Sequence, residues 1–384
     1  MNTSAFPNGN RPDGSGTDSQ NAFSSAAPCP QAASPAQQIP APVLLSDLHA
    51  HRASFSRIGA SMLMLLLGCQ LFAFLVSFVV GRFAPDIAET WWYSWVLTDV
   101  SLYGVGLPLM WLILRKVPAA PFNPTYRARG IVAEKPRFGF GWWILIAVIG
   151  MGAMQIGALV GQGFMKLLSY LVGYDYANGL ETIVSGSPLW ATFLGTVVLA
   201  PLGEEFIFRK LLIDRTRRWG DAVSVLLSGI LFGLFHGNLF QLFYTTMFGF
   251  LLAYIYTRTG RLGWCVGLHA LTNFWGGIIP TLLRNWIGTD IIADPEKLSA
   301  HLMKNPLQYF VYTLYGMIIY ALMIAAVVLL ICLRKKIRLG DGTCVLPAGR
   351  RFRTVVLNGG MTVALLAFLL VLLSALILPP LAAR

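Results

Sequence analysis

The sequence predicts an all-α membrane protein, a polytopic bundle of about nine transmembrane helices with a cytoplasmic N-terminus. Its 384 residues are 56% hydrophobic and only 12% charged, and their mean hydropathy is +0.63. A soluble core of this length cannot hide so much apolar surface. Several runs also reach the roughly 20 apolar residues that a helix needs to cross a bilayer. We therefore expect an integral, multi-pass protein that has the lipid bilayer as a partner.

Nine apolar segments are the candidate transmembrane helices. They lie at 58–80, 93–114, 142–172, 189–214, 221–237, 239–257, 262–283, 308–333 and 355–378. The chain then divides into a tail at 1–55, N-terminal helices at 56–187, a central region at 188–283 and C-terminal helices at 284–384. The tail is rich in Pro, Ala, Ser, Gly, Gln and Asn. It has too few aliphatic residues to offset its ordering entropy, so we expect it to be disordered.

Basic residues follow the loops and indicate the orientation. The formal net charge is +12, which in a soluble protein would favour nucleic acid. Here, however, Lys and Arg gather in the segments 115–141, 209–218 and 334–353, whereas 81–92 has only Arg82 and 173–188 has none. By the positive-inside rule the basic loops are cytoplasmic and the C-terminal tail is outside. We expect no nucleic-acid partner.

The cysteines predict no sulfur chemistry. None of the five has CxxC spacing; they are Cys29, Cys69, Cys265, Cys332 and Cys344. The expected topology puts all five in membrane helices or on the cytoplasmic side, so we expect neither disulfides nor a sulfur-rich metal site.

Two adjacent acids, Glu204 and Glu205, lie within an apolar stretch. Ionisable groups at membrane depth are costly and usually mark function. The segment 191–219 reads as one helix, with a kink at Pro201 that frees a backbone carbonyl. The acids then lie about 15 Å inside the surface that the arginines at 215–218 mark. A solvated helix end is the alternative, but the residues on both sides of the acids are apolar.

The two carboxylates cannot share one role, because neighbours on a helix point about 100° apart. Arg209 follows Glu205 by four residues, in the acid-before-base order that favours an ion pair. We expect Arg209 to neutralise Glu205 and Glu204 to face a cavity.

Further polar groups follow in the next apolar segments. His236 ends an apolar run, and His269 and Asn273 lie one helical turn apart on a shared face. A carboxylate base, two imidazoles and a carboxamide suit the hydrolysis of a bond by water, because one group takes a proton while others orient the water or stabilise an oxyanion. The same groups could hold Zn²⁺ with a water in the open position.

Three short motifs carry a resemblance to a known family. They are EEFIFR at 204–209, FGLFH at 232–236 and HALTN at 269–273. They resemble the motifs EExxxR, FxxxH and HxxxN of the CAAX prenyl protease and bacteriocin-processing family, also called the CPBP or Abi family. Each pattern is weak alone, but all three occur in order on successive membrane segments. The resemblance covers about 188–283, roughly a quarter of the chain.

The resemblance implies a membrane-embedded endopeptidase of a bacterial plasma membrane. By position, Glu204 would activate the water, and Glu205 and Arg209 would support it. The substrate would be a peptide or protein, such as a prenylated CAAX protein or a bacteriocin-like leader peptide.

The remaining motif residues leave the need for a metal open. The resemblance implies that His236 and His269 bind a metal or orient the water, and that Asn273 helps to stabilise the oxyanion. Family members are often described as metalloproteases. In this chain, Glu204, His236 and His269 would then be the ligands of a divalent metal such as zinc. A metal-free glutamate mechanism uses the same groups. The absence of HExxH excludes only the common soluble zincins.

Two other classes of protein compete with this interpretation. A non-catalytic immunity or scaffold member of the family would have lost acids or histidines, whereas this chain keeps all of them. A proton-coupled transporter would also have Glu and His at mid-membrane. It would show an internal repeat with matching broken helices, and the sequence shows none.

Overall fold

The computed structural model describes residues 41–42, 47–123, 125–128, 131–134 and 139–382. Most of the segment that we expect to be a disordered tail lies outside these residues. The first helix, α1 (Leu48–Phe83), begins inside that segment. Its first turn contains polar residues, which is why hydropathy alone places the helix start later.

The described chain is almost entirely helical, as predicted. The N-terminal elements after α1 are α2 (Pro85–Ala88), α3 (Trp91–Asp99), η2 (Val100–Gly106), α4 (Leu107–Leu114), α5 (Phe140–Val172) and α6 (Gly179–Ser185). The central elements are α7 (Leu189–Thr192), η3 (Phe193–Leu199), α8 (Ala200–Glu205), η4 (Phe206–Ile213), α9 (Asp214–Thr216), η5 (Arg217–Trp219), α10 (Asp221–Phe235), α11 (Leu239–Thr259), α12 (Leu262–Asn273), η6 (Phe274–Ile278) and α13 (Ile279–Ile287). The C-terminal elements are α14 (Thr289–Ile292), α15 (Pro295–Lys304), α16 (Pro306–Leu333), η7 (Ala348–Arg350), α17 (Arg351–Val355) and α18 (Gly359–Ala382).

The number of membrane-length helices differs from the expected nine. Within the described residues, seven helices are long and apolar enough to cross a membrane. The segment expected at 221–237 is α10, which has only 15 residues and is about 22 Å long, short of the roughly 30 Å of hydrocarbon. The segment expected at 262–283 is the run from α12 to α13, which is not among the seven. The membrane class is confirmed, but the count of nine is not.

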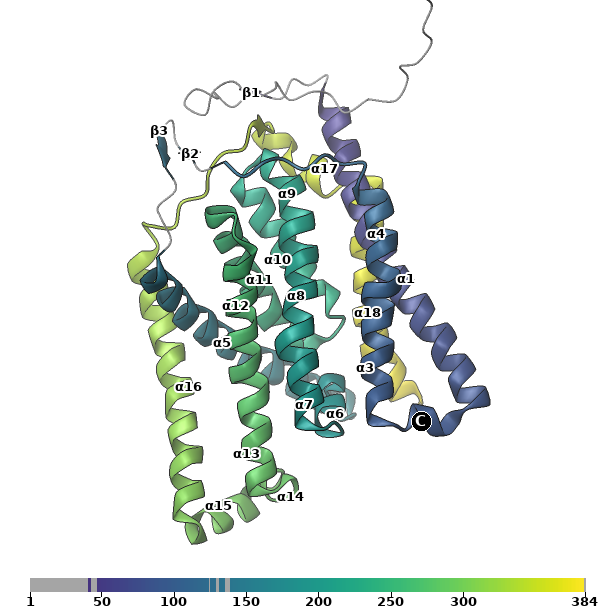
Figure 1. Ribbon diagram of the computed structural model, residues 1–384, viewed down its shortest axis with the longest axis vertical. Coiled ribbons are helices and arrows are strands. Elements are labelled where there is room, and N and C mark those ends of the chain that lie inside the picture. The colour runs from purple at the N-terminus through teal and green to yellow at the C-terminus, as the bar shows by residue number, and fades with distance from the viewer. Residues whose placement is uncertain (1–40, 43–46, 124, 129–130, 135–138, 383–384) are drawn as a thin grey trace, which may run out of the picture.

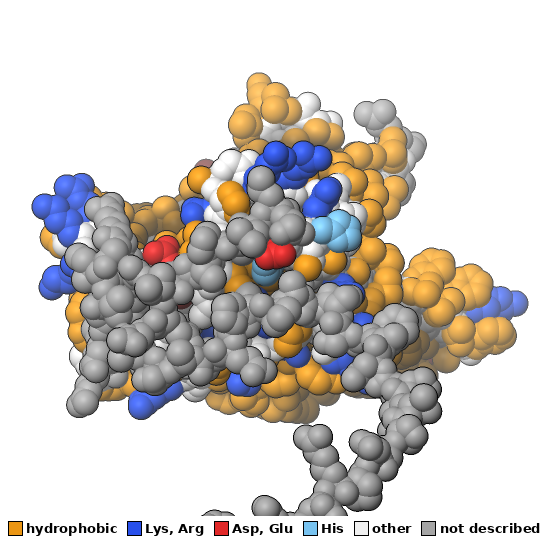
Figure 2. Space-filling model, turned by 90° about the horizontal axis from the view of Figure 1, so that it is seen from above, with side chains coloured by type: hydrophobic (Ala, Val, Ile, Leu, Met, Phe, Trp, Pro, Cys, Tyr) orange, Lys and Arg blue, Asp and Glu red, His pale blue; other side chains and the backbone are white. Residues whose placement is uncertain are grey.

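The two ends of the bundle differ in charge. In Figure 1, α9, α17 and the end of α4 lie at one end, and α6, α14 and α15 lie towards the other. The basic segments 209–218 and 334–353 therefore reach the same end. Figure 2 looks onto that end and shows Lys and Arg side chains there, with hydrophobic side chains around the sides. This arrangement agrees with the predicted grouping of the basic loops, and their placement in the cytoplasm stays a prediction.

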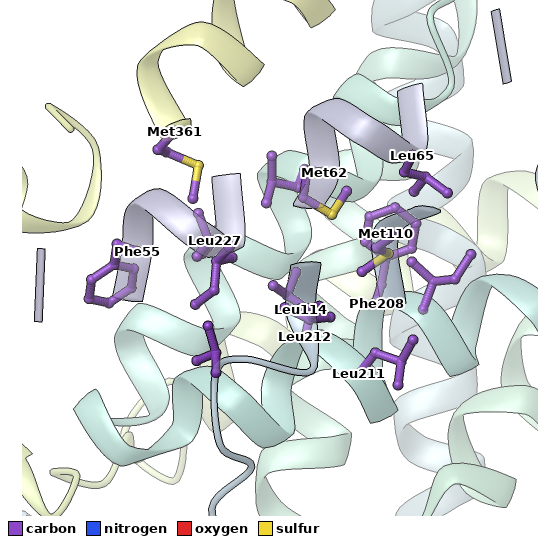
Figure 3. Packing of buried hydrophobic residues seen from close by; sticks show 14 of the residues in the cluster. Phe55, Met62, Leu65, Met110, Leu114, Phe208, Leu211, Leu212, Leu227 and Met361 are labelled. Atoms are coloured by element: carbon purple, nitrogen blue, oxygen red, sulfur yellow. The ribbon is translucent and has the colours of Figure 1, made fainter. Parts of the chain in front are cut away.

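Two hydrophobic clusters hold the central helices. Figure 3 shows the first, in which side chains from α1, α4, η4, α10 and α18 meet. Its labelled members are Phe55, Met62, Leu65, Met110, Leu114, Phe208, Leu211, Leu212, Leu227 and Met361. The second cluster joins α5, α11 and α12 through Ile146, Phe248, Leu252 and Leu268. The central helices are thus packed on two sides.

Close helix contact explains one glycine pair. A Cβ on Gly59 of α1 would lie 2.2 Å from the backbone nitrogen of Met361 in α18, and a Cβ on Gly360 would lie 1.9 Å from the carbonyl oxygen of Ser56. Only residues without a side chain permit this approach, as in many helix pairs in membranes. The first helix of the chain is therefore packed directly against the last.

The described residues also include four short strands and a disulfide-bonded cysteine. β2 (Thr125–Ala128) pairs antiparallel with β3 (Ile131–Glu134), and β1 (Ala41–Pro42) pairs parallel with β4 (Cys344–Val345). Cys344 is disulfide-bonded, so the expectation of no disulfide is wrong. The pairing of β1 with β4 joins distant parts of the chain, so no local sequence pattern indicates that Ala41 lies beside Cys344.

Candidate active site

Glu204 and Glu205 lie on one continuous helical run, α7 to η5, which we call the acid helix. It alternates α and π hydrogen bonding: η3 precedes the acids and η4 follows them. The run from α12 to α13 also contains a π segment, η6, directly after Asn273. Single π turns in helices often occur at functional sites. Within the described chain, these irregular segments border the two acids and Asn273.

The kink predicted at Pro201 takes the form of π pairing before the proline. Ala200 donates its backbone N–H to the oxygen of Gly195, five residues back. If the i to i−5 pairing continued by one residue, the nitrogen of Pro201 would donate to the backbone oxygen of Thr196. Proline has no N–H, so the Thr196 oxygen receives no such bond. The side-chain Nδ2 of Asn273 donates to this oxygen at 2.8 Å. Asn273 therefore ties α12 to the carbonyl that the proline leaves free.

Glu205 is paired as predicted. Its carboxylate Oε2 lies 2.9 Å from Arg209 Nε, and both side chains are completely buried. Arg209 Nη1 donates to Ser228 Oγ at 3.0 Å, and Ser228 Oγ donates to the carbonyl of Phe208 at 3.0 Å. The guanidinium also lies over the ring of Phe232, 4.8 Å from its centroid. The buried charges are thus compensated from two helices.

The same carboxylate orients His269. Glu205 Oε1 lies 2.9 Å from His269 Nδ1. Since Glu205 is ionised beside Arg209, it can only accept, so the imidazole carries its proton on Nδ1. In the neutral ring the other nitrogen, Nε2, then has a free lone pair.

His236 is fixed in the same tautomer by a different acceptor. Its Nδ1 lies 2.8 Å from the backbone oxygen of Phe232. A carbonyl oxygen cannot donate, so Nδ1 carries the proton and Nε2 is unprotonated in the neutral ring. In their neutral forms, both imidazoles therefore present a lone pair from Nε2.

These two lone pairs converge on Glu204. Its Oε2 lies 3.9 Å from Nε2 of His236 and 3.9 Å from Nε2 of His269. This oxygen is buried and has no hydrogen-bond partner among the described residues. The Glu204 side chain is 14% exposed, in contrast to the fully buried Glu205. We call the space bounded by Oε2 and the two Nε2 atoms the reaction centre.

The helices reach this arrangement through a turn after α10. Residue counts along α10 and α12 suggest unequal depths for the two histidines, about 22 Å and 12 Å from the basic end. His236 directly follows α10, and Gly237 adopts a left-handed φ of 58° before Asn238 caps α11. Only glycine adopts such a φ without strain. The turn lets α11 return beside α10 and leaves His236 level with Glu204.

The residue types at the reaction centre suit a metal, but their spacing does not. Two imidazoles that donate Nδ1–H to a carboxylate and a carbonyl are typical of zinc ligands. Ligands of one tetrahedral zinc, however, lie about 3.4 Å apart, less than the 3.9 Å observed here. Among the described residues no group of three or more His, Cys, Asp or Glu side chains is arranged to hold a metal ion.

The six residues singled out in the sequence fall into three groups in the structure. Glu205 and Arg209 form the buried pair, Glu204, His236 and His269 bound the reaction centre, and Asn273 contacts the acid helix.

Sequence reasoning missed Ser228, which accepts a hydrogen bond from Arg209. Ser228 lies eight residues before His236 in α10, a helical spacing that could have revealed it.

Comparisons with known proteins agree with the family resemblance that the three motifs indicate. Residues 186–275 match the family model described as "Rce1-like: Type II CAAX prenyl endopeptidase Rce1-like". The chain is also 28% identical over 183 residues to a Bacillus subtilis (strain 168) protein named "Putative membrane peptidase YdiL", covering 46% of this chain and 68% of that protein. No solved structure matches the chain. The matched region contains all six residues of the site.

Proposed function

We propose that this chain, a member of the CAAX prenyl protease and bacteriocin-processing family by its match over residues 186–275, hydrolyses a peptide bond with a water that Glu204 activates. The observation that carries the proposal is the convergence at one centre of two imidazole Nε2 atoms and a carboxylate oxygen that has no hydrogen-bond partner among the described residues. Three acceptors facing one point suit a water molecule, which donates two protons. The Glu204 oxygen that has no hydrogen-bond partner among the described residues would accept a proton from this water.

The water would be held by its two protons. One would be donated to Glu204 Oε2 and the other to Nε2 of His236 or His269, which leaves an oxygen lone pair free to attack the substrate carbonyl. Glu204 would take the proton as the new carbon–oxygen bond forms and deliver it to the leaving nitrogen as the carbon–nitrogen bond breaks. Atoms and charge balance without a further reactant.

Glu205 and Arg209 would act through His269. Because Glu205 accepts from Nδ1 of His269, it keeps the Nε2 lone pair directed at the reaction centre. Arg209 keeps Glu205 ionised at a position with no exposure to solvent. Neither residue needs to touch the substrate.

Asn273 would contribute a hydrogen bond to the oxyanion. A carboxamide nitrogen has two protons, and Thr196 accepts one of them. The second is available to the carbonyl oxygen of a bound substrate. This role extends the one that the motif implies, because the same side chain also fixes the acid helix.

The substrate class that we propose is a peptide or protein reaching the bundle from the membrane, either a prenylated CAAX protein or a leader peptide.

The decisive experiment uses the full chain, purified and reconstituted in liposomes, with a farnesylated CAAX peptide and a leader-peptide probe. Mass spectrometry of the products should show one defined cut with the wild type and none with Glu204→Gln. Glu296→Gln, on the exposed α15, is the matched control and should cleave normally. Equal turnover by Glu204→Gln and wild type would exclude the glutamate mechanism.

A metal requirement is tested separately. Since the ligand spacing does not fit zinc, cleavage should persist after dialysis against a chelator, and added Zn²⁺ should not raise the rate. Loss of activity on chelation, with recovery on adding zinc, would show instead that Glu204, His236 and His269 close around a metal.

A further inference from the structure

The proposed reaction needs more hydrogen-bond donors than the reaction centre offers. When water attacks a peptide carbonyl, the oxygen gains negative charge, and enzymes stabilise that charge with donors fixed beforehand. Glu204 and the two Nε2 atoms are all acceptors in the tautomers that Phe232 and Glu205 fix. One of the two side-chain N–H groups of Asn273 already donates to the backbone oxygen of Thr196. One further donor would complete the site.

Tyr103 brings a hydroxyl to the residue before Glu204. It lies in η2, a π-helical segment outside the matched family region. Its ring packs against Gly203 so closely that a Cβ on that glycine would lie 2.0 Å from Tyr103 Cε1 and 2.3 Å from its hydroxyl oxygen. The phenol is also within electrostatic reach of the Glu204 carboxylate. A glycine at 203 is therefore what allows the phenol to approach the acid helix.

The hydroxyl is free to change its acceptor. It donates to the backbone oxygen of Leu199 at 3.2 Å, and this contact is not buried. Hydrogen bonds from a hydroxyl to an oxygen normally measure 2.5–3.0 Å, so the resting bond is long. Exchanging it for a shorter bond to a charged oxygen is favourable, because hydrogen bonds to ionised groups are about twice as strong as neutral ones.

We propose that Tyr103 is a further catalytic residue, whose phenol O–H leaves Leu199 and donates a hydrogen bond to the oxyanion formed at the reaction centre. The phenol keeps its proton throughout, so no covalent step is added. The inference rests on the proposed hydrolysis and adds a residue from outside the three motifs.

The test compares two tyrosines of the same helical run. Tyr103→Phe removes the hydroxyl and keeps the ring that packs on Gly203. Loss of one oxyanion donor should lower kcat by about 10²-fold with little change in KM or in melting temperature. Tyr93→Phe is the matched control, because its hydroxyl contacts Ser77 on the exposed surface, and it should keep the wild-type kcat. Cleavage of the farnesylated peptide in liposomes is the assay.

The outcomes separate this inference from the proposed function. If the wild type cleaves and Glu204→Gln does not, but Tyr103→Phe keeps full kcat, only the role of Tyr103 is overturned. A fall in kcat with Tyr244→Phe instead would transfer the role to Tyr244, the other phenol within electrostatic reach of Glu204. A Tyr103→Phe variant that loses activity only in proportion to its folded fraction would reduce Tyr103 to a packing residue. Failure of the wild type to cleave any probe would remove both proposals.

Discussion

The surroundings of Glu205 and of Glu204 form two regions of opposite character, although the residues are neighbours in sequence. Glu205 has a partner for each carboxylate oxygen, because Oε2 is in an ion pair with Arg209 and Oε1 contacts His269, while Arg209 also donates to Ser228. At Glu204, in contrast, the buried Oε2 has two imidazole nitrogens at 3.9 Å and no hydrogen-bond partner among the described residues. Identical side chains thus differ in their partners alone, and this difference underlies the separate roles that we propose for them.

The largest expected effect is that of Glu204→Gln on activity. The amide keeps the shape of the carboxylate but cannot take a proton, so kcat should fall by at least about 10³-fold, within the range for loss of a general base. The melting temperature should change little, because no hydrogen bond to Oε2 is lost. Steady-state kinetics and a thermal scan in detergent measure both. A marked loss of stability would mean that Glu204 is as structural as Glu205.

Arg209→Met should have the largest effect on stability. It leaves the Glu205 carboxylate charged and buried without its partner, which costs about 3–5 kcal/mol of the free energy of unfolding. Adding Glu205→Gln should restore much of the loss, since no charge is then stranded. A double-mutant cycle gives the coupling. If the two changes add within about 0.5 kcal/mol, or if Glu204 couples more strongly to Arg209, the roles of the two acids are reversed.

Ser228→Ala should have an intermediate effect on the Glu205 region. It removes the acceptor of Arg209 Nη1 and the donor to the carbonyl of Phe208. Leaving buried polar groups without partners should lower stability by about 1–3 kcal/mol. Ser185→Ala is the control, because that serine is exposed and bonds only within its own helix. Equal melting temperatures for the two variants would show that Arg209 does not depend on α10.

The smallest expected effect is that of two cysteine substitutions that test the direction in which the bundle is inserted. Gly349→Cys changes a residue at the basic end, and Ser299→Cys changes a residue of α15, at the other end. Both positions are exposed, so activity should be unchanged. A membrane-impermeant thiol reagent applied outside intact cells should label only Ser299→Cys, because the positive-inside rule puts the basic end in the cytoplasm. Labelling of Gly349→Cys alone would reverse the orientation of the site.

The pairing of Glu205 with Arg209 was predictable because it is local. Four residues separate the two side chains, and helix geometry alone brings such pairs together. The count of membrane helices was less predictable. Hydropathy marks 221–237 and 239–257 equally as spans, but whether α10 ends at Phe235 depends on the Gly237 turn and on the helices that enclose it.

The contacts of Asn273 and Tyr103 could not be derived from the sequence. Asn273 binds an oxygen 77 residues away and Tyr103 one that is 96 residues away. No periodicity relates positions so far apart. The motif places Asn273 on the same helix face as His269, but only the packed helices show that it also holds the carbonyl freed by Pro201.

The sequence by itself determined that this protein lies in the membrane, that its candidate site residues fall within 204–273 and that Glu205 pairs with Arg209. These features follow from composition and from spacings within a helical turn, which every helix realises in the same way. The tertiary structure decided which nitrogen of each histidine faces Glu204, which carboxylate oxygen has no hydrogen-bond partner among the described residues and which tyrosine packs on Gly203. Those properties depend on contacts between helices, where a shift of about 1 Å exchanges one hydrogen-bond partner for another.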